Sequence, residues 1–292
     1  MDMSFFPSRH RCCPQCLKRR LLVKGQEVVE YYHRGVVFYL LGFRTAVPLD
    51  VEMLQPGEGE LTAAQRLLQR VVESYDRFFK VVLADALFFN APFFNLCLGL
   101  GKEVITVLKD EDRLLFQDAL GVFSFSAPQF WEEPNQKIRA WDAEGFTSAE
   151  GIEAPLRVLR TEELITRRHR DGKGWIQKKE THHWEWVTTL SVARLSTYLL
   201  WQIGHGRWEI ENDLFHTLAT YWSLDHCFRH EPIAILNFIL TLFIAFVLLQ
   251  SFYLGNLKSQ RRAHLTLISV ALELVFGLAA MDGPAPWLRR GG

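Results

Sequence analysis

The feature that most constrains the fold is an alternation of strand and helix patterns across residues 27–108. Residues 27–42 are rich in β-branched and aromatic side chains and predict a strand. Residues 44–54 predict a second strand, which Pro48 places at a sheet edge. From residue 61 to 79 apolar side chains recur with helical period, and we expect a helix there with Thr62 as its N-cap.

Two continuous apolar runs complete this pattern. Residues 80–89 and 103–108 each predict a buried strand, and residues 91–100 between them predict a helix that ends at Gly101. Continuous apolar runs are typical of parallel strands that are covered on both faces. Strands alternating with helices therefore predict an α/β fold.

The pattern changes after residue 111. Residues 112–190 are polar and rich in Trp, Gly and Pro, and their short alternating segments predict a mainly β insertion. Helical patterns return from about Val192 to Trp222 and from Ile233 to Tyr253. We expect a first core segment at residues 1–111, the insertion at 112–190, a helical remainder of the core at 191–255 and a tail at 256–292.

One apolar segment leaves two interpretations open. Residues 232–257 contain no charged side chain, and about 20 apolar residues are enough to cross a bilayer. A helix that is apolar on every side can also be the central helix of a soluble core. Four polar residues interrupt the run and favour the soluble interpretation: Asn237, Thr241, Gln250 and Ser251. We therefore predict a buried helix at residues 233–253 and no membrane partner, with a membrane-associated helix at 233–254 as the alternative.

Composition and charge narrow the class of protein. The chain has 292 residues, of which 49% are hydrophobic and 23% charged, and this excludes a disordered chain, a collagen or a disulfide-stapled miniprotein. Lys plus Arg number 33 and Asp plus Glu number 33, so the chain is not a strongly basic nucleic-acid-binding domain. We find no secretory signal before the crowded cysteines, and we expect a reducing compartment with thiols that are free or metal-bound.

Two carboxylates lie in unexpectedly apolar surroundings. Asp85 is the only charged residue between Lys80 and Lys102, and it lies toward the carboxyl end of its predicted strand, where open α/β sheets bind ligands. Glu211 shares the apolar stripe of its predicted helix, where it needs a nearby cation. Asp85 could instead bond loop amides, and Glu211 could pair with Arg207, four residues earlier. Two such carboxylates in one α/β domain nevertheless favour a divalent-metal site.

The segments around these carboxylates resemble bacterial insertion-sequence DDE transposases. VVLADALFFNAPFF (81–94) resembles the segment that carries the second catalytic Asp of that family. HGRWEIENDLFHTL (205–218), with YWSLDHCF (221–228), resembles the segment that carries the catalytic Glu. The family spacing between Arg and Glu is met by Arg207 and Glu211, whereas Gly204 and Leu218 stand where the family has Tyr and Lys.

The resemblance implies an RNase H-like fold, with a mixed five-stranded sheet, flanking helices and an insertion before the Glu-bearing helix. It also implies a first catalytic Asp shortly before a Cys-rich segment, and Asp2 matches this position, with Asp50 as a poorer alternative. Because the chain begins one residue before Asp2, we expect an N-terminally truncated copy. Asp2 should then lie near Asp85 on a frayed strand end, and DNA cleavage should be weak or absent.

The function implied by the resemblance is the cutting and joining of DNA at transposon ends. Asp2, Asp85 and Glu211 would bind two Mg²⁺ ions, which Mn²⁺ could replace, and would support in-line displacement at phosphorus. The partners would be double-stranded DNA at transposon ends and target, and a second copy in a synaptic homodimer, in the bacterial cytoplasm at the nucleoid. The rival functions are a related RNase H-like nuclease and a non-catalytic remnant that binds DNA or membrane.

Basic clusters flank the candidate catalytic segments despite the zero net charge. Contacts with DNA phosphates are expected from Arg207 and from four residues of the insertion: Arg167, Arg168, Lys178 and Lys179. The same insertion contains five tryptophans, and the resemblance implies that one of them could stack on an extruded base.

A structural zinc site is a further candidate. Cys13 and Cys16 have the two-residue gap of a zinc knuckle, and His33 is a possible third ligand. His10 and Cys12 are alternative ligands, and the distant pair at 182–183 could contribute through the fold. The spacing supplies only half of a zinc motif, and free thiols on a basic loop are the alternative.

Overall fold

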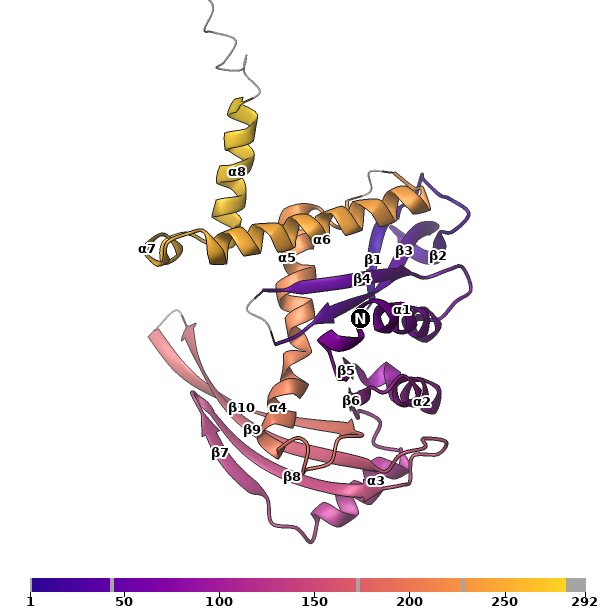
Figure 1. Ribbon diagram of the computed structural model, residues 1–292, viewed down its shortest axis with the longest axis vertical. Helices are drawn as coiled ribbons and strands as arrows, with labels where there is room; N and C mark the ends of the chain where they lie inside the picture. Colours follow the sequence, from indigo (N-terminus) through magenta and orange to yellow (C-terminus); the bar gives the residue numbers. More distant parts are fainter. Residues whose placement is uncertain (1, 43–44, 172–173, 227–228, 282–292) are drawn as a thin grey trace, which may run out of the picture. The chain divides into compact units, whose positions relative to one another are not determined.

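The computed structural model describes residues 2–42, 45–171, 174–226 and 229–281 (Figure 1). Side chains are described within these ranges except at residues 2–5, 169, 171, 174–175, 213, 261 and 278–281. The chain divides into two compact units. Unit 1 comprises Gly59–Trp208, and unit 2 combines Asp2–Glu58 with the chain from Glu209 onward.

Unit 2 begins with an antiparallel sheet of four strands: β1 (Asp2–Ser8), β2 (Leu17–Val23), β3 (Gln26–Leu40) and β4 (Val47–Met53). The long strand β3, which the β-branched run predicts, is central in this sheet. Tyr31 of β3 lies opposite both Ser8 and Lys18, and Gly35 lies opposite both Met3 and Met53. β1 therefore occupies one edge of β3, and β2 and β4 share the other edge.

The helical part of unit 2 differs from the sequence prediction. The predicted helix from residue 192 to 222 is three segments: α4 (Thr197–Gly206) in unit 1, then the π-helical turn η3 (Ile210–Phe215) and α5 (His216–Trp222) in unit 2. The long helix α6 (Pro232–Gly255) follows, and the predicted tail contains the short helix α7 (Ser259–Arg262) and α8 (Leu267–Met281). Pro232 at the first helical position and the Glu231 carboxylate, which accepts from the Ile233 and Ala234 amides, begin α6.

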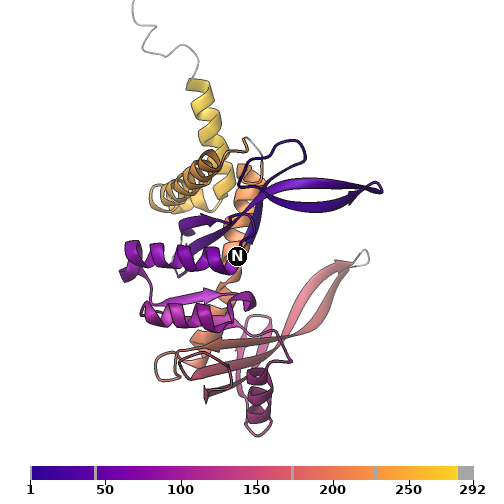
Figure 2. The same ribbon diagram turned by 90° about the vertical axis from the view of Figure 1, so that its right-hand side faces the viewer.

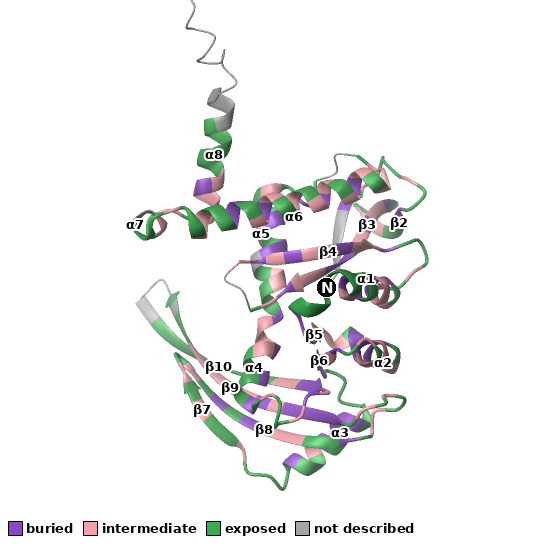
Figure 3. Ribbon diagram, in the orientation of Figure 1, coloured by how far each residue is buried: buried purple, intermediate pink, exposed green. Residues whose placement is uncertain are grey.

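The prediction that α6 is covered on most sides is wrong. Its buried residues form one stripe, and the helix contacts β4 and α8. The stripe consists of Ile235, Ile239, Phe243, Phe246, Leu249 and Gln250. Ile244 and Leu248 are 62% and 64% exposed, and Figure 3 shows exposed positions along the helix. The most apolar window of α6 has mean hydropathy 2.6, and by length and composition α6 is the one helix among the described residues that could cross a membrane. Burial is one-sided because β4, α8 and Trp222 of α5 together cover only part of a helix whose composition is apolar all round.

Unit 1 begins with the predicted α/β alternation. Its first elements are α1 (Glu60–Tyr75), the 3₁₀ turn η1 (Asp76–Phe78), β5 (Val81–Ala84), the 3₁₀ turn η2 (Ala86–Phe88), α2 (Ala91–Gly99) and β6 (Glu103–Val107). β5 and β6 pair in parallel, as the continuous apolar runs predict. Two details are corrected: α1 is preceded by Gly59 rather than capped by Thr62, and the strand expected over residues 80–89 ends at Ala84.

The insertion extends the same sheet. Residues 112–190 form α3 (Leu114–Phe123), β7 (Gln129–Glu133), β8 (Gln136–Phe146), β9 (Leu156–Asp171) and β10 (Gly174–Thr188). β10 pairs with both β6 and β9, which gives the order β5-β6-β10-β9-β8-β7. α4 packs on β6 and β9, and Gly204 of this helix lies against the buried Trp186 of β10. The insertion and the α/β core of unit 1 therefore share one sheet.

The described strands form two sheets, one of four strands in unit 2 and one of six strands in unit 1. β4, β3 and β1 are consecutive in one sheet, and β5 and β6 are neighbours in the other. β1 and β5 are terminal strands of their sheets as described. The mixed α/β class is confirmed, and the single five-stranded sheet and the domain boundaries at residues 111, 190 and 255 stay predictions.

Candidate functional site

Asp85 lies at the carboxyl end of a parallel strand. It is the first residue after β5, is half-buried, and its Oδ1 accepts a hydrogen bond from the Leu87 amide at 2.8 Å. This bond caps η2. It corresponds to the structural alternative for Asp85, a carboxylate that bonds loop amides. Among the described residues Oδ2 of Asp85 accepts no hydrogen bond, so one carboxylate oxygen remains for a cation.

Glu211 lies in the π-helical turn η3. π-Helical turns are rare and frequently occur at functional sites. Glu211 is half-buried, and Phe215 and Leu218 beyond it are buried, but Trp208 at the start of the predicted apolar stripe is 36% exposed. The stripe is altered because a π-turn inserts an extra residue into the helical period.

Arg207 closes α4 in unit 1. The side chain is largely buried, and its guanidinium lies over the Trp208 ring, 4.4 Å from the centroid. Aromatic stacking of this kind orients a guanidinium without using all of its donors. Its predicted contact with a DNA phosphate is untested and stays a prediction.

The two candidates for the first carboxylate lie in the sheet of unit 2. The backbone of Asp2 begins β1 opposite Val36, and its side chain lies outside the described residues. Asp50 lies on β4 and its Oδ1 accepts from the Val51 amide at 2.7 Å. Asp85 belongs to unit 1, whereas Asp2 and Glu211 belong to unit 2. The approach of these carboxylates to a common ion therefore stays a prediction.

The basic residues of the insertion gather on one hairpin. β9 and β10 form a long two-stranded arm that reaches away from the rest of its sheet (Figure 2). Four predicted phosphate contacts lie on this arm and are all exposed: Arg167, Arg168, Lys178 and Lys179. Arg167 lies directly opposite Lys178 in the ladder, so like charges face each other across the strands. Such a pair is unfavourable unless an anion is nearby.

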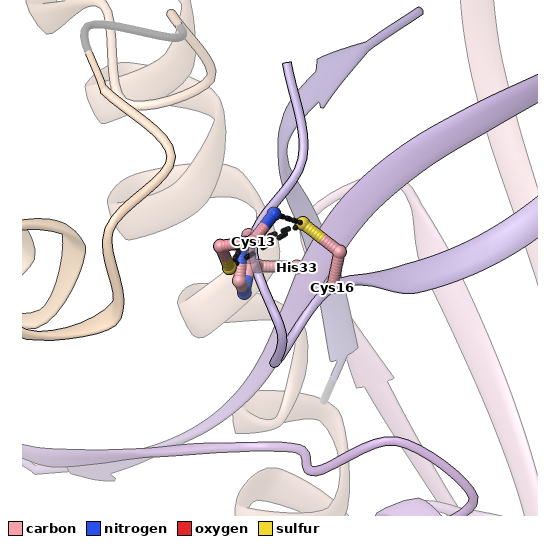
Figure 4. A group of neighbouring side chains, drawn as sticks. All are labelled: Cys13, Cys16 and His33. Carbon is pink, nitrogen blue, oxygen red and sulfur yellow. Dashed lines mark hydrogen bonds between the residues drawn. The ribbon is translucent and has the colours of Figure 1, made fainter.

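The cysteine cluster converges with two histidines inside unit 2. Cys13 and Cys16 Sγ lie 3.5 Å apart, and each lies 3.4 Å from Nε2 of His33 on β3 (Figure 4). These three ligand atoms lie within 4.8 Å of one another. Cys16 Sγ also lies 3.1 Å from Nδ1 of His230, just before α6. Cys12 is exposed and does not belong to this group.

The protonation states in this cluster are set by burial. Burial and, to a smaller extent, the nearby His230 together lower the pKa of His33 to about 4, so the imidazole is neutral at pH 7. Burial also raises the pKa of the Cys16 thiol to about 11. The site thus offers the neutral imidazole of His33, and the Cys16 thiol becomes a thiolate only when a cation compensates the charge.

Sequence reasoning missed His230 and a buried polar cluster around Glu163. Glu163 on β9 is fully buried and accepts hydrogen bonds from Trp201 Nε1 at 2.8 Å and Gln136 Nε2 at 2.6 Å, and its Oε1 lies 2.8 Å from His205 Nε2. Despite burial, which raises it, the pKa of Glu163 is lowered overall because His205, Trp201 and Thr161 stabilise the carboxylate. Buried and half-buried side chains alternate over residues 159–164 of β9, and Glu163 shares the buried face with Thr161. This alternation is the one sequence signal that could have indicated a buried carboxylate at residue 163.

Comparison with known proteins identifies the family. Residues 27–248 match the family described as the transposase DDE domain. The match includes Asp85 and Glu211 and begins after Asp2 and Cys13. Because it covers most of the chain, this protein belongs to the DDE transposase family and has the general function of a transposase.

Other comparisons add little. No curated protein matches the sequence. A solved S-adenosylmethionine-dependent methyltransferase from Clostridium acetobutylicum ATCC 824 is 11% identical, with 36% of this chain and 40% of that chain covered and a TM-score of 0.13. A likeness this slight carries no argument about the fold or function of this protein.

Proposed function

We propose that this chain cuts DNA at transposon ends and joins it to a target by two-metal phosphoryl transfer. The observation that carries the proposal is the family match, which includes a strand-end carboxylate, Asp85, and a carboxylate in a π-helical turn, Glu211. Asp2 is proposed as the third ligand, with Asp50 as the alternative. The proposed location is the bacterial cytoplasm at the nucleoid, and the proposed assembly on DNA is a homodimer.

The chemistry of the donors fits Mg²⁺ or Mn²⁺. These hard cations prefer carboxylate oxygens, and both Asp85 and Glu211 are half-buried carboxylates. When bound, two such ions activate a water or a 3′-hydroxyl and stabilise the leaving oxygen. The bond from the Leu87 amide would hold the Asp85 carboxylate in one orientation, with Oδ2 directed to the ion.

The proposal requires the two units to bring their carboxylates together. The five-stranded mixed sheet that the family resemblance implies is part of this proposal, and the metal is expected to require all three carboxylates at one site.

Metal-directed cleavage of the protein tests this arrangement. Fe²⁺ would replace Mg²⁺ in the full-length chain, and ascorbate with peroxide would generate radicals that cut the backbone beside the bound ion. We expect cuts near both Asp85 and Glu211, which Mg²⁺ suppresses and which Asp85→Ala abolishes. Asp118→Ala, an exposed acid on α3, is the matched control and should leave the cuts unchanged. Cuts near one carboxylate alone would refute the shared site.

The same experiment distinguishes the first carboxylate and the rival functions. Cuts near residue 2 favour Asp2, and cuts near residue 50 favour Asp50. A plasmid that carries the DNA flanking this coding sequence on both sides then serves as substrate with Mg²⁺. Cleavage followed by joining supports a transposase, cleavage without joining supports a nuclease, and no metal-directed cutting at all supports a non-catalytic remnant.

We further propose that the β9–β10 arm binds DNA phosphates. Side chains alternate between the two faces of the arm, so Arg168 and Lys179 share one face, and Arg167 and Lys178 share the other. Glu180 lies 2.7 Å from Lys178 Nζ and partly neutralises the second face. The face with Arg168 and Lys179 is therefore the stronger candidate.

Salt-dependent binding to a duplex tests this interface. The double variant Arg168→Ala/Lys179→Ala should bind a random-sequence duplex more weakly, and the slope of log affinity against log salt should fall by about 2, one for each lost phosphate contact. Lys137→Ala on β8 is the control, because Lys137 is exposed but paired with Glu132 at 2.8 Å. Equal loss in both variants would contradict a specific role for the arm.

A further inference from the structure

Four possible metal ligands from three distant parts of unit 2 lie near one another. Cys13 and Cys16 lie in the turn between β1 and β2, His33 lies on β3, and His230 lies immediately before α6. Cys16 and His33 are buried, at 4% and 2% exposure. We propose that these four residues bind one structural zinc ion, which fastens the beginning of α6 to the N-terminal sheet.

The spacing of the donor atoms fits a tetrahedral ion. Zinc bonds of about 2.3 Å to sulfur and 2.0–2.1 Å to nitrogen place neighbouring ligands about 3.4–3.8 Å apart. The observed separations are 3.5 Å between the two sulfurs and 3.4 Å from each sulfur to His33 Nε2. His230 Nδ1 lies 3.1 Å from Cys16 Sγ, which places a possible fourth donor beside one of the three ligand atoms.

The second nitrogen of His230 prepares it for coordination. Its Nε2 lies 2.8 Å from the carbonyl oxygen of Phe6 and donates its proton there. In the neutral imidazole that bond leaves Nδ1 without a proton, with its lone pair available to an ion. A ligating histidine commonly bonds its other nitrogen to a backbone carbonyl in this way.

The turn that carries the cysteines is also formed for a metal. The Cys16 amide donates to the Cys13 carbonyl at 3.1 Å, and the Cys13 amide donates to Cys16 Sγ at 3.1 Å. A backbone amide directed at sulfur stabilises the thiolate. A disulfide is a poorer explanation, because the sulfurs are 3.5 Å apart and a disulfide bond is about 2.05 Å long.

Burial makes the site structural rather than catalytic. A catalytic zinc keeps a position open for water or substrate, whereas a structural zinc has four protein ligands. Cys16 and His33 are nearly inaccessible, and mixed sulfur and nitrogen donors favour zinc over the Mg²⁺ of the carboxylate site. The ion would join residues that are 214 positions apart in the chain.

Zinc content of the purified full-length protein tests the proposal. Wild type prepared without chelator should contain one zinc per chain, measured by mass spectrometry, and Cys16→Ser and His230→Ala should each reduce it to background. Cys12→Ser is the matched control, because Cys12 lies on the same turn but is exposed. Asp85→Ala should also retain its zinc, which separates this site from the proposed catalytic one.

Cobalt spectroscopy keeps the test decisive if a variant fails to fold. Co²⁺ added to the apoprotein of the wild type should give the intense visible absorption of tetrahedral cobalt with a thiolate charge-transfer band, and Zn²⁺ should displace it. Wild type without zinc and without this spectrum would overturn the site. A folded His230→Ala protein that retains one zinc and the same cobalt spectrum would overturn the assignment of His230 as the fourth ligand.

Discussion

The buried ion pair between Asp142 and Arg157 predicts a large loss of stability from one substitution. Asp142 lies on β8 and Arg157 on β9, and their side chains are 2% and 1% exposed. Arg157 donates two hydrogen bonds to the carboxylate, at 2.8 and 2.5 Å, and a third to the Leu195 carbonyl at 2.6 Å. The hydroxyl of Thr197 donates to the same carboxylate at 2.7 Å. Asp142→Ala removes the common acceptor and leaves a guanidinium buried without its counter-charge.

The expected magnitude follows from that uncompensated charge. Breaking a buried ion pair by removing one partner costs about 3–5 kcal/mol. The matched control is Glu162→Ala, because Glu162 pairs with Arg139 on the same two strands with side chains 27% and 51% exposed. An exposed pair contributes only about 0.2–1 kcal/mol. Replacing both buried partners, Asp142→Leu with Arg157→Met, should recover most of the loss, because no charge remains buried.

Urea unfolding followed by tryptophan fluorescence measures these differences. Unit 1 includes four tryptophans whose fluorescence reports on its unfolding: Trp131, Trp184, Trp186 and Trp201. We expect the midpoint of Asp142→Ala to fall well below that of Glu162→Ala, with the double substitution between Asp142→Ala and wild type. Equal midpoints for Asp142→Ala and Glu162→Ala would refute the reasoning.

Two further predictions concern the contact of α4 with the sheet. Gly204→Ala should destabilise unit 1 by about 1–3 kcal/mol in urea unfolding, because its Cβ would lie 2.5 Å from Nε1 of the buried Trp186. The control is Gly121→Ala on α3, where an added Cβ would meet nothing within 4 Å, and it should leave stability unchanged. Equal effects of the two substitutions would contradict the prediction. The pKa of Glu163 is lowered in the folded state, mainly by His205. Wild type should therefore be more stable than Glu163→Gln. This difference in free energy should be complete above about pH 6 and shrink as the pH falls below the ordinary carboxyl pKa of 4.5. An advantage that grows on acidification, measured by urea unfolding from pH 7 to 3, would show that the sign is wrong.

Local pattern predicted the elements around Asp85 because their causes are local. The helical period over residues 61–79 corresponds to α1, and the two apolar runs correspond to the parallel strands β5 and β6. The end of β5 at Ala84 was missed, although its cause is local too: the Asp85 carboxylate bonds the Leu87 amide and turns the chain. The apolar pattern predicted a ligand site at the carboxyl end of this strand, and Asp85 lies directly after that end.

The packing of α6 could not be predicted from its composition. Its residues are apolar all round, and this is compatible with full burial, with one packed face and with a membrane. The structure rules out full burial: one face is packed, in part against β4, and Gln250 on that face bonds both backbone groups of Ala46. Which face is covered depends on where another segment lies, and that position is absent from the helix's own sequence.

By itself, then, the sequence determined the α/β alternation, the positions of Asp85 and Glu211 and half of a zinc motif at Cys13 and Cys16. Only the tertiary structure joined the cysteines to His33 and His230 and placed Glu211 in a π-helical turn. The physical reason is that periodicity records how each residue meets its near neighbours in the chain. A metal site depends instead on donor atoms that converge in space, and folding alone brings together residues that lie 214 positions apart.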